Sequence, residues 1–201
     1  MDAADELYAT GPIWDERPDE IVADVLARLP TGRVLDLGAG EGRHAVWLAL
    51  KGWQVTAVDS SAVAMGNLQA LAAVRGLSID AVIADATSYS PRKQAYDLVL
   101  LRYLELRVPS LRLALKTAAT ALAPPGRLLL IAHDASNLDH GYGGPQNPEV
   151  LTTPEVVAGI LTRLGLEVVR AEVVGRPITT EDGVIRVALD HVVEAVNSPA
   201  A

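Results

Sequence analysis

A glycine-rich turn carries the clearest chemical signal in the sequence. Residues 36–42 read Asp-Leu-Gly-Ala-Gly-Glu-Gly and lie between an apolar run and a segment of helical periodicity. Glycines at such a turn permit positive φ and let a ligand approach the backbone, while the helix that follows offers unpaired N–H groups. Gly38, Ala39 and Gly40 are therefore predicted to line a ligand site. A turn that only joins a strand to a helix is the alternative.

The spacing of the turn separates two classes of ligand. The dinucleotide-binding fingerprint has glycine or alanine where Arg43 stands here, and Asp36 lies two residues before the first glycine. A carboxylate so close would repel a pyrophosphate. It suits a ligand with an amino group and a sulfonium, such as the methionine end of S-adenosylmethionine. The other interpretation of Asp36 is a cap for the N–H groups of the turn.

Two further carboxylates follow the next two predicted strands. Asp59, with Ser60 beside it, lies about 20 residues beyond the glycines, where nucleoside-binding α/β folds place the acceptor for the ribose hydroxyls. Asp85 is expected to accept from the adenine amino group while the N–H of Ala86 donates to the ring. Either aspartate could instead cap the next helix. Three acids at three successive strand ends lie along one crevice, and this favours a nucleoside site.

The acceptor side is predicted at two later strand ends. Leu101 ends the fourth strand and is counted with the cofactor residues, and Tyr103 just after it is a candidate catalytic residue. His133 closes the fifth strand and is the candidate general base, since the ordinary pKa of a histidine is about 6.5; bracing of the following loop is the alternative. A base is needed only where the acceptor carries a proton that must leave, and a thiolate needs none.

Two segments could cover the site. Residues 133–152 lack convincing periodicity and contain three glycines, so they are predicted to form a substrate loop. Residues 1–17 are a possible lid, in which Trp14 folds over the donor. Packing of Trp14 on a helix that starts near Pro18 is an equal alternative.

Alternating strands and helices must position these residues. The strands are expected at 33–37, 54–58, 79–83, 96–101 and 127–132, with a turn at 124–126; the helices at 41–51, between Ser61 and Gly76, at 109–122 and at 153–165. Short apolar strands separated by helices indicate a parallel sheet covered on both faces. Two longer strands at 166–174 and 184–196 have no helix between them and predict an antiparallel terminal hairpin.

Composition excludes several classes of function. The chain has 201 residues, no cysteine and a net charge of −8, so it has no disulfide and no zinc–thiolate site, and we expect no metal. The basic residues are scattered, so no stripe for nucleic acid is visible. No apolar run is long enough for a membrane span and no export signal is visible, so a cytoplasmic location is expected.

Four segments resemble the successive motifs of class I S-adenosylmethionine-dependent methyltransferases. They read Val-Leu-Asp-Leu-Gly-Ala-Gly-Glu-Gly-Arg-His from position 34, Val-Thr-Ala-Val-Asp from 55, Ala-Asp-Ala from 84 and Tyr-Asp-Leu-Val-Leu from 96. The resemblance covers about residues 14–196 and is nearest to the small tellurite-resistance-like and thiopurine-like branch, whose substrates are often small and soft. A departure is Pro125, in a turn that more often reads Pro-Gly-Gly.

The resemblance implies a fold and a set of roles. The fold is an α/β, Rossmann-like, seven-stranded and mostly parallel sheet with helices on both faces and an antiparallel terminal hairpin, here as one domain over 1–201. Asp36 and Gly38 would lie near the methionine moiety, Asp59 on the ribose and Asp85 at the adenine.

The expected function is methyl transfer from S-adenosylmethionine to a small-molecule acceptor, by a monomer or homodimer. A non-catalytic sensor or assembly protein that keeps the cofactor pocket is the alternative. A nicotinamide-dependent reductase is disfavoured by Arg43 and by the terminal hairpin.

Overall fold

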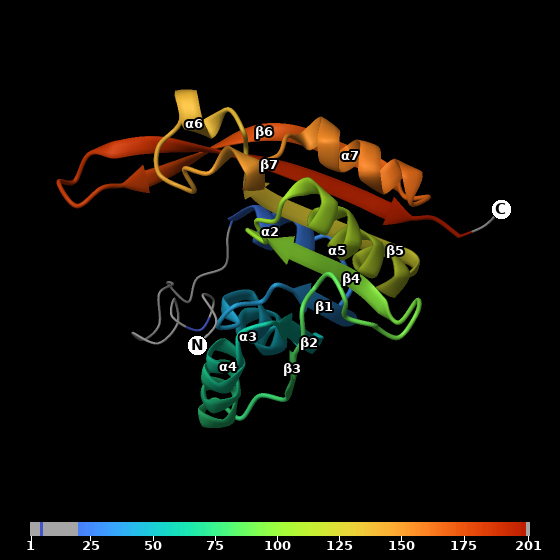
Figure 1. Cartoon of the computed structure of the whole chain (residues 1–201). Coiled ribbons are helices and arrows are strands. Elements are labelled where there is room, and N and C mark those ends of the chain that lie inside the picture. Colours follow the sequence, from blue (N-terminus) through green and yellow to red (C-terminus); the bar gives the residue numbers. More distant parts are fainter. Residues whose placement is uncertain (1–4, 6–19, 200–201) are drawn as a thin grey trace.

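Strands and helices alternate along most of the chain. The computed structural model describes Asp5 and residues 20–199 (Figure 1). In chain order the elements are α2 (Glu20–Leu26), β1 (Arg33–Leu37), α3 (Arg43–Leu50), β2 (Gln54–Asp59), α4 (Ala62–Val74), β3 (Ile79–Ile83), β4 (Tyr96–Arg102), α5 (Val108–Ala121), β5 (Leu122–His133), α6 (Asn137–His140), the 3₁₀ turn η1 (Pro148–Val150), α7 (Pro154–Arg163), β6 (Glu167–Thr179) and β7 (Ile185–Asn197).

The sheet has seven strands in the order β3-β2-β1-β4-β5-β7-β6. The first five are parallel, and β7 runs antiparallel to both β5 and β6. The strand order reverses between β1 and β4, because β2 and β3 lie on one side of β1 whereas β4 and β5 lie on the other. In open α/β sheets ligands bind outside the carboxyl ends of the strands at this reversal.

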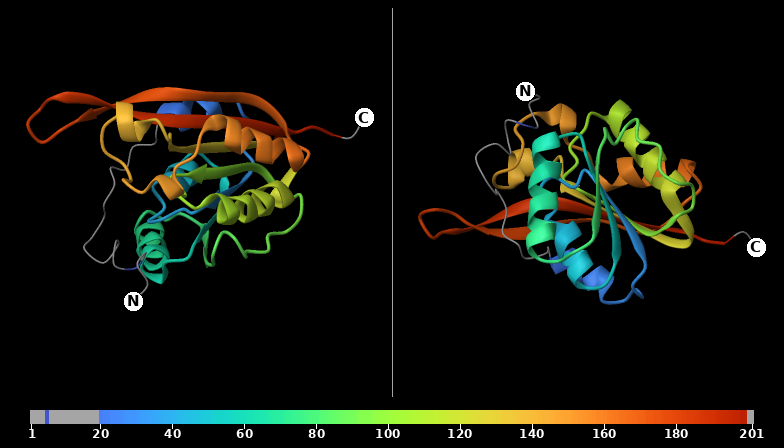
Figure 2. Two further views of the ribbon diagram at one scale, coloured as in Figure 1. Left: turned by 45° about the horizontal axis from the view of Figure 1, so that its top comes forward. Right: turned by 90° about the horizontal axis from the view of Figure 1, so that it is seen from below.

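Helices cover both faces of the sheet (Figure 2). Side chains of α2, α3 and α4 pack on one face, and those of α5 and α7 pack on the other. Both clusters consist almost entirely of Leu, Val, Ala, Ile and Met, which fits a sequence without phenylalanine. The predicted fold class is therefore confirmed.

Two predicted boundaries were wrong. Residues 124–126 were expected to be a turn before a strand at 127, but β5 begins at Leu122 directly after α5. Leu122 pairs with Tyr96 and Arg127 with Leu98, so the additional residues on β5 are absorbed by an irregularity within the ladder. The terminal strands were also expected to stop at 174 and resume at 184, whereas β6 continues to Thr179.

The additional length of β6 and β7 forms an arm. The last pair between β5 and β7 joins His133 to Asp190, and from there the two terminal strands continue as a two-stranded ribbon (Figures 1 and 2). At its tip the N–H of Thr180 donates to the Val184 carbonyl at 2.9 Å. The arm therefore carries side chains from late in the sequence past the carboxyl end of β5.

The segment after β5 is anchored to the sheet. Asp134 forms an isolated parallel bridge with Thr152. The side-chain oxygen of Asn137 accepts from the N–H of Leu189 on β7 at 2.7 Å, and its amide nitrogen donates to the Gly143 carbonyl at 2.8 Å. These bonds position the predicted substrate loop over the carboxyl end of β5 and the neighbouring part of β7 around Leu189.

Across Asp5 and residues 20–199, the model contains no helix with the length and apolar character that a membrane span requires. The same residues contain no group of three or more His, Cys, Asp or Glu side chains that could hold a metal ion.

Candidate functional site

The glycine turn between β1 and α3 depends on left-handed backbone. Gly38, Gly40 and Gly42 have φ values of 82°, 53° and 78°. A Cβ atom on Gly38 would lie 2.9 Å from Leu104, and one on Gly42 would collide with Leu68 of α4. The N–H groups of Gly38 and Ala39 both donate to the Val58 carbonyl, at 2.8 and 3.0 Å. The turn is thus fixed against β2.

Asp36 is the one acidic side chain at the bottom of a small pocket beside this turn. Its side chain is 2% exposed, and its Oδ2 has no hydrogen-bond partner among the described residues. The pocket has a volume of about 90 Å³ and is lined by Asp36, Gly38, Ala39, Gly40, Arg43, His44, Arg102 and Tyr103. Burial, reinforced by the charge of Asp59, raises the pKa of Asp36 to about 7, although Arg102 and a backbone bond from Ala45 act in the opposite direction. A buried carboxylate of this kind is stabilised by a cation or by a hydrogen-bond donor.

Asp59 and Asp85 both bond to nearby backbone. Asp59 accepts from the N–H of Gly40 at 2.8 Å and from that of Ser61 at 2.9 Å. Asp85 is exposed and accepts from the N–H of Thr87 at 2.7 Å. Neither aspartate is a helix cap, because Ser61 is the N-cap of α4 and the described residues between Asp85 and β4 contain no helix. A carboxylate has about four acceptor positions, so further bonds to a ribose or an adenine stay possible and stay predictions.

The remaining predicted cofactor residues fall into three situations. Ser60 is exposed, and it is Ser61 that caps α4 by accepting from the N–H of Ala64 at 3.1 Å. Ala86 and Leu101 are buried with their side chains in the core. They can therefore reach a ligand only through their backbones. Trp14 lies outside the described residues.

Asp5 is the only described residue of the predicted 1–17 lid segment. It accepts from the Ser61 hydroxyl at 2.7 Å and from the N–H of Val63 at 3.3 Å. That position is at the start of α4, next to Asp59. The lid itself stays a prediction.

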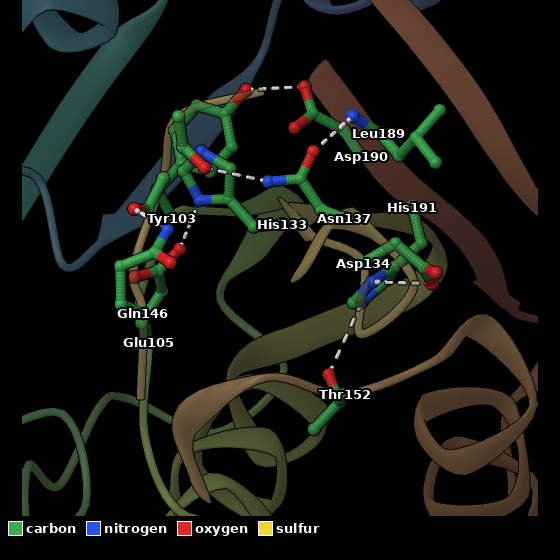
Figure 3. A network of polar contacts seen from close by, with 12 residues as sticks. Tyr103, Glu105, His133, Asp134, Asn137, Gln146, Thr152, Leu189, Asp190 and His191 are labelled. Atoms are coloured by element: carbon green, nitrogen blue, oxygen red, sulfur yellow. Dashed lines mark hydrogen bonds and ion pairs between the residues drawn. The ribbon is translucent and has the colours of Figure 1, made fainter. Parts of the chain in front are cut away.

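Tyr103 links the pocket to a second polar cluster (Figure 3). Its φ is 51°, an uncommon value for a residue with a side chain. Tyr103 is one of the residues that line the pocket, and its ring stacks on the His133 imidazole, with centroids 4.5 Å apart. The hydroxyl donates to Asp190 at 2.6 Å, and burial together with that carboxylate raises the pKa of Tyr103. The phenol is therefore held protonated, and the guanidinium of Arg102 lies over its ring, 4.3 Å from the centroid.

His133 lies between charged groups from three elements. Its Nδ1 contacts the carboxylate of Glu105, which follows β4, and Nη2 of Arg176 on β6 lies 3.4 Å from its Nε2. Arg176 also donates to Asp190 on β7, at 2.6 and 3.3 Å. Gly144 of the substrate loop lies against the ring, where a Cβ would come within 2.8 Å of Cδ2. The structure thus brings His133 and Tyr103 together.

A buried cluster lies behind this site. The His191 Nε2 lies 3.5 Å from the Thr152 hydroxyl, and its Nδ1 lies 3.7 Å from Asp134. Burial lowers the pKa of His191 despite the nearby carboxylates, so the ring is neutral near pH 7. This cluster joins the end of the substrate loop to β7.

Sequence patterns missed three participants: Glu105, Arg176 and Asp190. The signal for Glu105 was its position two residues after Tyr103. Arg176 and Asp190 could have been paired by counting outward from the turn at 182–183, because nearly opposite residues of a hairpin share a face.

A larger groove, of about 820 Å³, lies at the opposite edge of the sheet. Its walls come from the amino ends of β1, β4 and β5, including Arg33, Asp97 and Pro125, and from the end of β7. None of the predicted site residues lines it.

The family of the chain follows from its sequence once this geometry is in place. Residues 13–171 match a family model described as a methyltransferase domain. The chain belongs to this family of methyltransferase domains. Membership of this family implies S-adenosylmethionine as the methyl donor.

Two curated relatives of this methyltransferase domain have names that specify a macromolecular substrate, a protein in one case and ribosomal RNA in the other. A protein-L-isoaspartate O-methyltransferase of Methylorubrum extorquens is 33% identical over 110 residues, 55% of this chain and 46% of the relative. A ribosomal RNA small subunit methyltransferase C of Chromohalobacter salexigens is 30% identical over 128 residues, 57% and 38% of the two chains. This chain thus spans less than half the length of either relative.

Solved structures share the fold of the methyltransferase domain. The PH0226 protein of Pyrococcus horikoshii has a TM-score of 0.73 at 18% identity, covering 96% of this chain and 99% of that one. TehB of Haemophilus influenzae has 0.73 at 19%, covering 90% and 63%. A phosphoethanolamine N-methyltransferase of Haemonchus contortus, solved with S-adenosylhomocysteine, has 0.69 at 17%, covering 90% and 52%.

Replacing Asp59 by asparagine tests the part of the donor site that is predicted to hold the ribose. The amide would turn an N–H₂ group toward the N–H of Gly40 or of Ser61, which loosens the turn and weakens a ribose contact. We expect the dissociation constant for S-adenosylhomocysteine, measured by calorimetry, to rise roughly tenfold. Asp80→Asn in β3 is the matched control and should leave it unchanged. Equal constants for wild type and Asp59→Asn would remove Asp59 from the donor site.

Proposed function

We propose that this chain transfers a methyl group from S-adenosylmethionine to a small-molecule acceptor at the carboxyl ends of β1, β4 and β5. The observation that carries the proposal is the buried Asp36 with its unpartnered Oδ2. The amino group of the donor would satisfy that oxygen, and the nearby sulfonium would favour a negative charge there.

The rest of the donor would extend from this pocket toward Asp59 and Asp85. The pocket of about 90 Å³ has room for the amino-acid end only. The glycine turn supplies three of the residues that line this pocket, Gly38, Ala39 and Gly40, so its backbone would lie next to the donor. The donor supplies a methyl group on a positively charged sulfur, which leaves as a neutral thioether.

The acceptor side favours catalysis over a sensor that only binds the cofactor. Tyr103, His133 and the loop around Gly144 form a shaped polar wall beside the pocket. We propose that Tyr103 positions the acceptor with its ring and that His133 accepts a proton. A binding protein has little use for such a wall.

A small acceptor is favoured over RNA by charge. The chain carries 25 acidic and 17 basic side chains, and an RNA-binding surface needs clustered cations. Membership of the tellurite-resistance-like and thiopurine-like branch stays a prediction, because TehB is no more similar to this chain in fold than PH0226 is.

The test combines binding with turnover. Calorimetry should show binding of S-adenosylmethionine and none of NADH, which separates a methyltransferase from a reductase. Release of S-adenosylhomocysteine is then measured with thiols, phenols, amines and oxyanions, and in parallel with isoaspartyl peptide and ribosomal RNA. Turnover of a small acceptor supports the proposal. Turnover of only the peptide or the RNA contradicts it, and donor binding without any turnover favours the sensor.

A further inference from the structure

The two nitrogens of the His133 imidazole face groups of opposite hydrogen-bonding character. Nδ1 contacts Glu105, and an ionised carboxylate only accepts hydrogen bonds. Nε2 faces Arg176, and a guanidinium only donates them. Both neighbours select the same neutral tautomer, with the proton on Nδ1 and the lone pair on Nε2. The imidazole is thus oriented with its proton-accepting nitrogen away from Glu105.

The contact of Arg176 with His133 is weaker than the contact of Arg176 with Asp190. The Arg176–His133 distance is 3.4 Å, whereas Arg176 donates to Asp190 at 2.6 Å. A ligand can therefore take the place of Arg176 at Nε2 while the guanidinium keeps Asp190. Glu105 and His133 are both largely buried, with side chains 18% and 14% exposed, so water competes little for their contact.

From this geometry, and resting on the proposed methyl transfer, we propose that Glu105 is a positioning residue that prepares His133 to take a proton from the acceptor. The acceptor is then a molecule whose reacting oxygen or nitrogen carries a proton at neutral pH, such as a phenol or an amine, and not a soft anion. Nothing in the glycine turn or in the family match implies this class.

The step balances without any other reactant. A lone pair of the acceptor atom forms the new bond to the methyl carbon, and the carbon–sulfur bond breaks with its electron pair staying on sulfur. The proton of the acceptor atom passes to Nε2 of His133 and leaves to water after product release. Glu105 stays ionised and stabilises the imidazolium that forms.

Several charged or titratable groups surround this imidazole. They are Glu105 in the segment after β4, Tyr103 at the end of β4, Arg176 on β6, and Asp190 and His191 on β7. Tyr103 is held protonated and Arg176 is paired with Asp190, so neither changes charge near neutrality. The carboxylate in contact with the ring is Glu105.

The first measurement needs no acceptor. Nitrogen-15 NMR of the full chain, with histidine labelled, reports the tautomer of each of the four histidines; His133→Gln assigns the signal. Wild type should show a protonated Nδ1 and an unprotonated Nε2 at pH 8. Glu105→Leu should shift this to a tautomer mixture, and Glu105→Gln, which keeps an accepting oxygen, should restore the wild-type signal. Glu172→Gln, in an exposed ion pair on β6, is the control.

The second measurement uses catechol and a primary amine as protic probes and 2-mercaptoethanol as the thiol. Wild type should release S-adenosylhomocysteine with a protic probe. Glu105→Leu should lower kcat roughly 10- to 50-fold with KM for the donor nearly unchanged, and Glu105→Gln should recover part of it. Release with the thiol alone, or with no protic probe, overturns the acceptor class. An unchanged tautomer in Glu105→Leu, with only a lower melting temperature, overturns the positioning role. Absent donor binding would instead defeat the proposed function.

Discussion

Replacing His133 by alanine is expected to lower kcat by roughly 10²–10⁴ while the dissociation constant of the donor stays within about twofold. The imidazole contacts the Tyr103 ring, Glu105 and Arg176, but it does not line the pocket that contains Asp36. A loss confined to kcat is therefore the sign of a proton acceptor. If the true acceptor is already a soft anion, the same change should cost little in rate.

Glutamine at position 133 separates this role from bracing of the loop. Its amide can still donate to Glu105, but it cannot take up a proton near neutral pH. Turnover of both variants is measured from pH 5.5 to 9 with the best acceptor of the screen, where wild type should show a rise that both variants lack. A His133→Gln enzyme with the wild-type rate and profile would leave His133 as a brace.

Replacing Asp36 by asparagine is expected to act on affinity and on stability in opposite directions. The charge that meets the amino group and sulfonium of the donor is lost, so the dissociation constant should rise roughly 10- to 150-fold. The free protein should become more stable, because a buried carboxylate without a partner at Oδ2 is replaced by a neutral group. Asp97→Asn, at the other end of the sheet, is the control and should keep donor affinity while losing a little stability through its Arg33 contacts.

The free energy of unfolding of the free protein should depend on pH through Asp36, and the direction of this dependence follows from its pKa. The pKa of Asp36 is about 7 in the folded chain, against an ordinary value of 3.8 for an aspartate. The folded state therefore binds more protons than the unfolded state between these values, and the contribution of Asp36 to stability falls as pH rises from about 4 to 7. The full difference is on the order of 4 kcal/mol. In chemical denaturation, the stabilities of wild type and Asp36→Asn should be similar below about pH 4, and their difference should grow up to about pH 7 and stay constant above it.

The pH dependence of donor binding should also report the ionisation of Asp36. Only ionised Asp36 pairs with the donor, so affinity should fall by roughly tenfold from pH 7.5 to pH 6 in wild type and stay flat in Asp36→Asn. Calorimetry in two buffers with different ionisation enthalpies should also detect a proton released on binding near pH 6.5. Matching pH profiles for the two proteins would mean that Asp36 does not meet the donor.

Local patterns were enough to place three aspartates and not enough to find Asp190 and Arg176. Asp36, Asp59 and Asp85 lie at or next to the carboxyl ends of β1, β2 and β3, so strand periodicity and the rule for parallel sheets place them at one end of the sheet, and their contact with the donor stays a prediction. Asp190 and Arg176 belong to a hairpin whose register depends on the turn, and a shift of one residue would turn both to the other face.

The error at 122–126 has a related cause. Pro124, Pro125 and Gly126 are turn formers in isolation, but here the flanking Leu122 and Arg127 are both held by pairing with β4. Tertiary pairing overrode the local preference. The contact of Glu105 with His133 was beyond sequence patterns for a different reason, since it joins the segment after β4 to the end of β5, 28 residues along the chain.

The groove at the amino ends of β1, β4 and β5 has a consequence for the search for inhibitors. It is about nine times larger than the pocket beside the glycine turn, and it is lined by Trp53, prolines and Arg33 and by none of the predicted site residues. A compound bound there would lie at the other end of the strands from Asp36 and His133 and would not compete with the donor. A useful screen for this protein therefore counts only hits that S-adenosylhomocysteine displaces.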